Sequence, residues 1–341
     1  MLCFYEISLK LRIFAEMIRD YMRKSIIAIL FLLCGINLSA QNVATNWAVA
    51  DLSVSYLRSA PDYESSLETQ VLMGSVLDII GSENYWLHVL AMEPRYEAWV
   101  NELALERMDA DALQEYTAAP KYICMVHHSE LKSAPAASAP RISGAVMGDI
   151  VRQSLNSSGN AVVRGSWLEV LTPSGTKAYA PRKDFVDFGR WAARTKADGA
   201  SVAEIALSMA GAPYLWGGLS VDGMDCSGLV LLSYFMNGIL LPRNASQQAK
   251  CGVEVSREEL EPGDLIFFGN PDTGSINHVG ISLGGLRFIH SSQRVRISTL
   301  DPQDVDYYSS KPVLALRRII GHVDEGKGAM SITKSPYYFK Q

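Results

Sequence analysis

A cysteine at position 226 and two histidines at positions 278 and 290 are the residues of this chain best suited to nucleophilic catalysis. Cys226 follows a glycine-rich stretch and precedes the apolar run 229–236, so we expect it in the first turn of a buried helix. A helix N-terminus carries partial positive charge and free N–H groups, which lower a thiol's pKa and can hold the oxyanion of an acyl intermediate. The pattern predicts a thiol nucleophile that needs a base.

The two histidines lie on neighbouring apolar runs, 277–283 and 286–292, which indicate a β-hairpin turning at Gly284-Gly285. A two-residue turn would leave His278 and His290 on opposite faces, whereas a three-residue turn would place them on the same face. We therefore expect an odd-length loop. His278 would then take the thiol proton, and His290 would hold the other ring nitrogen of His278.

Helices and strands that could position these residues surround them between residues 195 and 321. A helical pattern with Ser201 as its N-cap and Gly211 as its stop precedes the cysteine. The strand 265–268 follows a turn that contains Asp264, and 313–320 is expected to be a closing strand. Helices followed by an antiparallel sheet predict an α+β domain.

Residues 50–188 contain an internal repeat of about 74 to 80 residues. The matching segments are Leu57-Arg-Ser-Ala-Pro61 with Leu131-Lys-Ser-Ala-Pro135, Met73-Gly74 with Met147-Gly148, Trp86-Leu-His-Val-Leu90 with Trp167-Leu-Glu-Val-Leu171, and Ala98-Trp99 with Ala178-Tyr179. Short β-branched runs between turn residues predict two small all-β units of about five strands, with a polar insert at 156–160 in the second. The repeats resemble bacterial SH3 domains, which implies two small barrels at 41–115 and 120–188.

The N-terminus has the pattern of a secretory signal. A start at Met22 is followed by basic residues, the short apolar run 26–35 and a small residue at Ala40, so residues 1–40 are expected to be a leader. The apolar run is too short for a membrane span, and Cys34 lacks the small residues that precede a lipid anchor. We expect an exported protein, periplasmic or secreted, with no stable membrane span after signal cleavage.

The composition is that of an ordinary globular protein. A net charge of −5 leaves no basic surface for nucleic acid, so we expect no nucleic-acid partner. No His, Asp and Glu residues show metal-ligand spacing, and we expect no metal or other cofactor. The mature chain keeps three cysteines, so at least one thiol is free, and pairing of Cys124 with Cys251 is left open.

Five successive motifs of the C-terminal region resemble those of the NlpC/P60 cysteine peptidases. They are Tyr214-x-Trp216-Gly-Gly, Asp225-Cys-Ser-Gly228, Pro262-Gly-Asp-Leu265, His278-Val-Gly-Ile281 and His290-Ser291. The resemblance implies a papain-like domain at 195–321, followed by a C-terminal tail at 322–341. It also implies Cys226 as nucleophile, His278 as general base and acid, and His290 as the residue orienting His278.

Barrels ahead of such a domain look like the γ-D-glutamyl-L-diamino acid endopeptidases, which cleave cell-wall stem peptides or released muropeptides with a free N-terminal L-Ala. This implies that Tyr214 contributes to the oxyanion hole and that Asp225 and Ser227 line the groove. Trp216 is either a groove residue or a core residue. For the substrate amine the first barrel would supply Glu68 and Tyr96, with Glu64, Glu83 and Glu97 as alternatives.

Two other classes of function stay open at this stage. The same scaffold could be an amidase or acyltransferase, or the chain could be a wall-binding protein with weak or no catalysis. Arg243 is expected to be a solvated loop residue and Asp264 a turn residue. Whether the diamino acid is diaminopimelate or lysine does not follow from these residues.

Overall fold

The computed structural model describes residues 46–195 and 197–339. The predicted leader, residues 1–40, lies outside the described residues. None of the helices in the described part of the chain is long and apolar enough to span a membrane.

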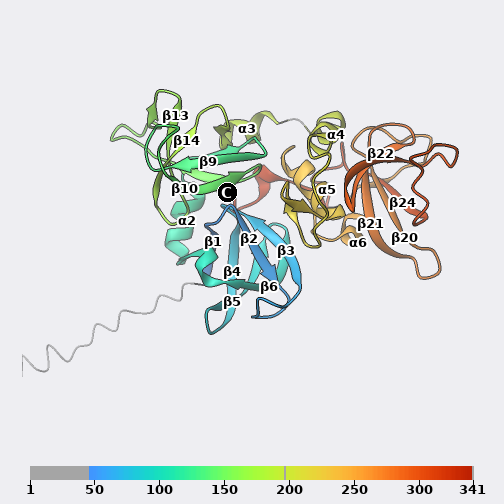
Figure 1. The fold of residues 1–341 in the computed structure, drawn as a ribbon, viewed down its shortest axis with the longest axis horizontal. Helices are drawn as coiled ribbons and strands as arrows, with labels where there is room; N and C mark the ends of the chain where they lie inside the picture. The colour runs from blue at the N-terminus through green and yellow to red at the C-terminus, as the bar shows by residue number, and fades with distance from the viewer. Residues whose placement is uncertain (1–45, 196, 340–341) are drawn as a thin grey trace, which may run out of the picture. The chain divides into compact units, whose positions relative to one another are not determined.

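The first sheet contains seven antiparallel strands (Figure 1). Its strands are β1 (Trp47–Ala50), β2 (Val54–Arg58), β3 (Leu67–Leu72), β4 (Val76–Glu83), β5 (Trp86–Met92), β6 (Arg95–Asn101) and β7 (Leu105–Met108). They pair in the order β3-β2-β6-β5-β4-β1-β7. Small and branched residues such as Ala48, Leu57 and Val89 alternate toward one face and form its core. The 3-10 helix η1 (Glu102–Ala104) precedes β7, and α2 (Ala110–Ala118) follows it.

The second sheet repeats the same strand order. Its strands are β8 (Lys121–Cys124), β9 (His128–Lys132), β10 (Arg141–Val146), β11 (Ile150–Gln153), β12 (Val163–Arg164), β13 (Trp167–Leu171), β14 (Lys177–Pro181) and β15 (Phe185–Asp187). They pair as β10-β9-β14-β13-β11-β8-β15, with β12 added on β13. Strand for strand this is the order of the first sheet, so the internal repeat is confirmed.

Equivalent glycine turns join the two sheets. Gly74 and Gly148 both have a positive φ, and their N–H groups donate to Ala50 and Cys124, the last residues of β1 and β8. The buried Asp149 carboxylate accepts from the Met73 N–H, so each turn contacts the other sheet. The expectation of about five strands per unit was too low. Seven strands are shared, and the polar insert precedes the extra strand β12.

The C-terminal region combines helices with a six-stranded antiparallel sheet, orange to red in Figure 1. Its helices are α3 (Phe188–Arg194), α4 (Gly199–Ser208), α5 (Cys226–Phe235) and α6 (Ala245–Gln248). The sheet contains β19 (Val253–Glu254), β24 (Val313–Arg318), β20 (Leu265–Asn270), β21 (Ser275–Ser282), β22 (Arg287–Ser292) and β23 (Arg294–Thr299), in that order. The short strands β16 (Leu219–Ser220) and β17 (Gly223–Met224) form a hairpin just before α5.

One local prediction differs from the structure. Asp198, not Ser201, caps α4, because its carboxylate accepts the N–H groups of Ala200 and Ser201. Asp and Ser are both short polar residues that suit an N-cap, so the residue type alone does not decide between them. The helix α3, whose Phe188 is buried, connects the second sheet to α4.

The last residues pack against the rest of the chain. The short strand β25 (Met330–Ser331) pairs with β18 (Ile239–Leu240), and η2 (Ile332–Lys334) follows it. Tyr337 packs against Trp47 of the first sheet at a ring distance of 6.1 Å. Phe339 stacks on Phe188 of α3 at 5.0 Å. Residues 330–339 therefore contact α3 and the first sheet as well as the strand after α5.

Candidate active site

Cys226 is the first residue of α5, as its sequence context predicts. Asp225 is the N-cap and accepts the N–H of Gly228 at 2.7 Å. Every residue of α5 is buried, because its apolar run packs into the core on all sides. Cys226 itself is 8% exposed, and its sulfur faces the backbone N–H groups of Val279 and Ser227. The thiol therefore lies against β21, next to His278.

The hairpin formed by β21 and β22 brings the two histidines together. Ser282 pairs with Phe288, and the N–H of Leu283 donates to Arg287, which leaves a three-residue turn at 284–286. This odd loop length places His278 and His290 on one face. His278 Nε2 and His290 Nδ1 are 2.7 Å apart, so the predicted hairpin register is confirmed.

One assignment of protons satisfies every ring nitrogen in this chain of contacts. If His278 Nδ1 is free to accept a proton, Nε2 carries the hydrogen and donates to His290 Nδ1. His290 must then carry its hydrogen on Nε2, which is 3.1 Å from Ser298 Oγ. The Ser298 hydroxyl can accept this hydrogen, so the contact accommodates the His290 tautomer that the base form of His278 requires.

Burial sets the resting protonation of the three side chains. It raises the pKa of Cys226 to about 11, with the Asp225 charge adding to the rise. It lowers the pKa of His278 to about 4, helped by the cations Lys311 and Arg296, and that of His290 to about 3. Burial therefore outweighs the lowering of the Cys226 pKa that its place at a helix N-terminus predicts. Both shifts favour a neutral thiol and a neutral imidazole, so proton transfer accompanies attack on a substrate.

Tyr308 covers the histidine pair and has no counterpart among the residues predicted from sequence. Its ring lies 5.5 Å from that of His278 and 4.9 Å from that of His290, edge-on to the latter. Phe268 packs against the same tyrosine at 4.9 Å. The aromatic rings exclude water from the His278–His290 hydrogen bond, which strengthens it. Tyr308 lies in an irregular segment, where sequence periodicity gives no signal.

Tyr214 and Trp216 lie on the glycine-rich loop ahead of α5. Tyr214 is 37% exposed, and burial together with the nearby Cys226 and Asp225 raises its pKa to about 12. Its hydroxyl therefore keeps its hydrogen and can donate to an oxyanion. Trp216 is 65% exposed, which excludes the core alternative for this residue.

Arg243 is buried at the start of α5, which corrects the expectation of a solvated loop arginine. It is 1% exposed, and its guanidinium donates to both Asp225 oxygens at 2.6 and 3.1 Å and to Ser227 Oγ at 2.9 Å. Asp225 and Ser227 are themselves buried by these contacts. That they also line the groove stays a prediction. Their side chains hold the catalytic helix in place.

The same arginine joins the first sheet to the catalytic helix. Its Nε donates to Thr69 Oγ1 of β3 at 2.7 Å. The neighbouring Gln70 accepts the N–H of Leu219 at 2.7 Å, just after the glycine-rich loop. Gly217 approaches Glu68 so closely that a Cβ would lie 3.1 Å from the Glu68 carbonyl carbon and oxygen. Strand β3 therefore lies directly against the loop that carries Tyr214 and Trp216.

Glu68 sits at a bulge in β3. Leu57 pairs with Thr69 and Arg58 with Leu67, so Glu68 is the extra residue, and a bulge redirects the side chain that it carries. The Tyr96 hydroxyl donates to Glu68 Oε2 at 2.8 Å. Burial and the Glu68 carboxylate raise the pKa of Tyr96 to about 12. The charge of Asp225 also raises this pKa, whereas the charge of Arg243 lowers it. The structure thus brings Glu68 and Tyr96 together beside the catalytic helix.

The alternative carboxylates for a substrate amine are placed differently. Glu97 forms an ion pair with His88 at 3.1 Å, and its side chain is 62% exposed. Glu64 is exposed in the loop between β2 and β3, and Glu83 is exposed at the end of β4. Of the four candidates, Glu68 is the one whose backbone touches Gly217.

Cys124 and Cys251, the other two cysteines in the described part of the chain, are buried and unpaired. Cys124 ends β8 and Cys251 packs under Gly328, so the pairing left open from sequence is not formed. Burial raises the pKa of Cys251 to about 11. Within residues 46–195 and 197–339, no group of three or more His, Cys, Asp or Glu residues is arranged to hold a metal ion.

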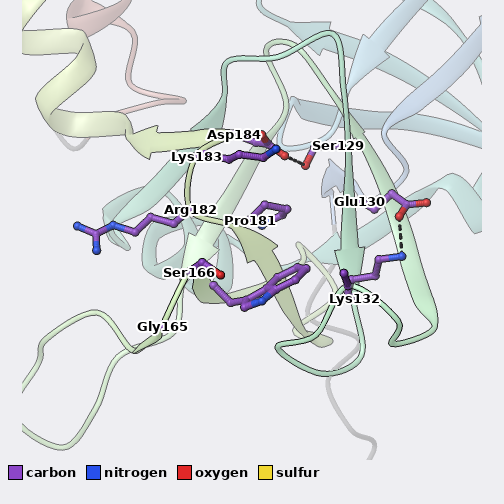
Figure 2. A pocket seen from close by; sticks show the side chains of 11 residues that line it. Ser129, Glu130, Lys132, Gly165, Ser166, Pro181, Arg182, Lys183 and Asp184 are labelled. Carbon is purple, nitrogen blue, oxygen red and sulfur yellow. Dashed lines mark hydrogen bonds and ion pairs between the residues drawn. The ribbon is translucent and has the colours of Figure 1, made fainter.

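A cavity of about 940 Å³ lies on the second sheet (Figure 2). Trp167 and Pro181 form its apolar wall, and Lys132 and Glu130 pair on one side of it. Asp184 accepts from Ser129 Oγ at 2.7 Å on another side. No residue of the candidate active site lines this cavity.

Family models match two segments of the chain. Residues 211–317 match the NlpC/P60 family, and residues 57–105 match the bacterial dipeptidyl-peptidase SH3 domain. The first match covers the loop of Tyr214, the helix of Cys226 and both histidines. The second covers β3 and β6, which carry Glu68 and Tyr96.

Curated relatives and solved structures extend this likeness over most of the chain. The γ-D-glutamyl-L-lysine dipeptidyl-peptidase of Bacillus subtilis is 27% identical over 75% of this chain and 82% of its own length. Dipeptidyl-peptidase 6 of Lysinibacillus sphaericus is 26% identical over 75% of this chain and 92% of its own. The crystal structure of an NlpC/P60 family protein from Bacillus cereus superposes with a TM-score of 0.68 at 23% identity, covering 80% of this chain and 99% of that one. The last match shows a shared fold.

Proposed function

Since the chain carries an NlpC/P60 domain preceded by a bacterial SH3 domain, we propose that it is a thiol peptidase that cleaves the γ-D-Glu–diamino acid bond of murein peptides with a free N-terminal L-Ala. The observation that carries the proposal is the 2.7 Å contact between His278 and His290 beside the buried Cys226 thiol. The names of the relatives, dipeptidyl-peptidases, agree with release of L-Ala-D-Glu from the N-terminus of a stem peptide.

Catalysis proceeds through an acyl-enzyme. His278 Nδ1 takes the thiol proton while Cys226 Sγ attacks the γ-carbonyl carbon of D-Glu. The Tyr214 hydroxyl and the N–H of Cys226 stabilise the tetrahedral oxyanion. The protonated His278 then donates to the amine of the diamino acid as the C–N bond breaks. A water molecule deprotonated by His278 hydrolyses the thioester, releasing L-Ala-D-Glu and restoring the thiol.

The first sheet supplies the site for the substrate amine. An ammonium needs a carboxylate, and Glu68 offers one that Tyr96 already orients at 2.8 Å. A muramic acid on the alanine removes that positive charge and adds bulk where β3 closes the groove. Stem peptides already released from muramic acid are therefore the preferred substrates, and Trp216 forms part of the groove wall.

The domain organisation follows from the same proposal. Both sheets are SH3-like barrels, 41–115 and 120–188, ahead of a papain-like α+β domain at 195–321. The leader at residues 1–40 directs export, so the enzyme acts in the periplasm or outside the cell.

The experiment that tests this function is incubation of the mature protein with L-Ala-γ-D-Glu-diaminopimelate, with products followed by mass spectrometry. We expect L-Ala-D-Glu to be released by the wild type and by Cys251→Ala but not by Cys226→Ala. Cys251 is a matched control because its thiol is also buried and its pKa is also raised to about 11. Equal activity in all three proteins, or none in the wild type, would contradict the proposal.

A further inference from the structure

Charge is distributed unequally along the candidate active site. The side near the glycine-rich loop holds the carboxylate of Glu68 and the hydroxyl groups of Tyr96 and Tyr214. The side near the histidines holds two cations, Arg296 and Lys311, which both lower the pKa of His278. The site therefore has a carboxylate near the glycine-rich loop and two cations near the histidines.

Arg296 reaches the site from β23. It is the direct cross-strand partner of His290, so the two side chains leave the sheet on the same face. Its Nε is buried and has no hydrogen-bond partner. Such an unsatisfied donor costs free energy, and a bound acceptor would remove that cost.

Lys311 reaches the site from the segment between β23 and β24. Its ammonium donates to Asn277 Oδ1 at 2.7 Å, one residue before His278. Within the described residues, neither Lys311 nor Arg296 has a carboxylate at ion-pair distance. Arg287 of β22, by contrast, is neutralised by Asp304 at 3.3 Å. Two unneutralised cations thus flank His278.

We infer that Arg296 and Lys311 bind the carboxylates of the diamino acid on the leaving side of the scissile bond, and that they favour diaminopimelate over lysine. This rests on the proposed function, in which His278 protonates the leaving amine, so the group next to His278 and its cations is the diamino acid. Diaminopimelate carries one carboxylate more than lysine. The Arg296 guanidinium and the Lys311 ammonium can each bind one carboxylate, so together they match the two carboxylates of diaminopimelate better than the single carboxylate of lysine.

The charges along the peptide are then opposite to those along the candidate active site. The substrate ammonium lies at Glu68 and the carboxylates lie beyond the scissile bond at Arg296 and Lys311. The B. subtilis relative is named for L-lysine as its diamino acid. Arg296 and Lys311 would therefore give the present chain a different diamino acid preference from the one in that protein's name.

The test measures kcat/KM for L-Ala-γ-D-Glu-diaminopimelate and L-Ala-γ-D-Glu-L-Lys in the wild type, Arg296→Gln and Lys311→Gln. We expect the wild type to prefer the diaminopimelate peptide about tenfold, and each variant to lose most of that ratio through KM, since it lacks one charged hydrogen bond to the additional carboxylate. Arg296→Lys should retain part of the preference. Arg287→Gln, which removes an already neutralised arginine, should leave the ratio unchanged.

A third peptide separates two sources of carboxylate. In the γ-D-isoglutaminyl form the α-carboxylate of the D-Glu is amidated while the diaminopimelate is intact. If the dependence on Arg296 persists with this peptide, the cations bind the diamino acid. If the dependence disappears, they bind the glutamyl carboxylate and the inference is overturned, as it is if the wild type uses diaminopimelate and lysine equally.

A binding measurement keeps this inference separate from the proposed function. Calorimetry with Cys226→Ala should show tighter binding of the diaminopimelate peptide, and adding Arg296→Gln should remove the difference. Failure of the wild type to cleave any peptide would contradict the proposed function, whereas equal binding of both peptides to Cys226→Ala would overturn the diamino acid preference.

Discussion

The two sheets share one strand order and one bulge but present different side chains at that bulge. In the first sheet the register slips at Glu68, and in the second it slips at the equivalent Ile142. The first carries a carboxylate toward the catalytic loop, while the second carries an apolar residue that is 40% exposed. The repeated fold thus places a bulge at the same point of each sheet. The residue at that bulge decides whether the sheet contributes to the candidate active site.

A second pair of equivalent positions shows the same divergence. His88 faces Trp99 across β5 and β6 and stacks on it at 4.5 Å. At the corresponding place in the second sheet, Glu169 faces Tyr179 and accepts its hydroxyl at 3.2 Å. The replacement of both partners together keeps the cross-strand contact while changing its chemistry. The second sheet also has a cavity of its own, lined in part by Trp167 and Pro181.

The largest expected effect comes from breaking the link between the first sheet and the catalytic helix. Arg243→Met leaves the Asp225 carboxylate buried without its partner at 2.6 Å, and the loss of one member of a buried ion pair costs about 3–5 kcal/mol of folding free energy. Urea unfolding followed by tryptophan fluorescence measures this change. Lys177→Met removes an exposed lysine from its Glu169 pair in the second sheet and should cost less than about 1 kcal/mol. Equal losses of unfolding free energy in the two variants would contradict the claim that a buried ion pair links the first sheet, and not the second, to the catalytic helix.

The next effect concerns the bulge itself. Glu68→Gln keeps the shape but removes the charge that meets the substrate ammonium, so kcat/KM for a free-amine peptide should fall about 10- to 100-fold, the range of a lost charged hydrogen bond. Ile142→Gln, at the equivalent bulge, should leave kcat/KM unchanged. Steady-state kinetics on the same peptide measure both. A loss in Ile142→Gln as large as that in Glu68→Gln would show that the bulges do not differ in function.

A smaller effect distinguishes the two tyrosine–glutamate hydrogen bonds. Tyr96→Phe removes the hydroxyl that orients Glu68 at 2.8 Å but keeps the carboxylate that meets the ammonium, so kcat/KM should fall only roughly 2- to 10-fold. Tyr179→Phe removes the matching contact to Glu169 at 3.2 Å in the second sheet. We expect no kinetic change there. The acetylated peptide, which lacks the ammonium, should be insensitive to either change.

The smallest expected effect is a shift in pH dependence. His278 acts as a base only when neutral, so kcat/KM should fall as the pH drops through its pKa of about 4. Lys311 and Arg296 lower that pKa and Asp225 raises it. Removing a cation favours the protonated ring, so Arg296→Gln should move the acid limb to higher pH. A pH–rate profile of the two proteins measures the shift, and a shift to lower pH would contradict the placement of Arg296.

Local sequence patterns were sufficient for the parts of the site that depend on neighbouring residues. The apolar run after Cys226 predicts its helix, and Gly284-Gly285 predicts the odd loop that aligns His278 with His290. Turn chemistry fixes strand register, and register fixes which side chains share a face. The repeat was found from sequence for the same reason, because its turns and tryptophans recur at similar spacing.

Contacts between distant segments were not predictable in this way. Arg243 appears solvated from its polar loop, yet Thr69, 174 residues away, completes its burial. The pKa of Cys226 depends on how deeply the whole helix is buried, which outweighs the helix N-terminus. Tyr308 and the packing of residues 330–339 likewise depend on tertiary contacts that leave no periodic signal.

The most direct measurement compares cleavage of L-Ala-γ-D-Glu-diaminopimelate with cleavage of its N-acetylated form, in the wild type and in Glu68→Gln. If the first sheet supplies the amine site beside Cys226, the wild type cleaves the free peptide far faster, and Glu68→Gln loses most of that ratio by slowing the free peptide alone. Equal cleavage of both peptides by the wild type would contradict the role of the first sheet, even with the peptidase activity intact.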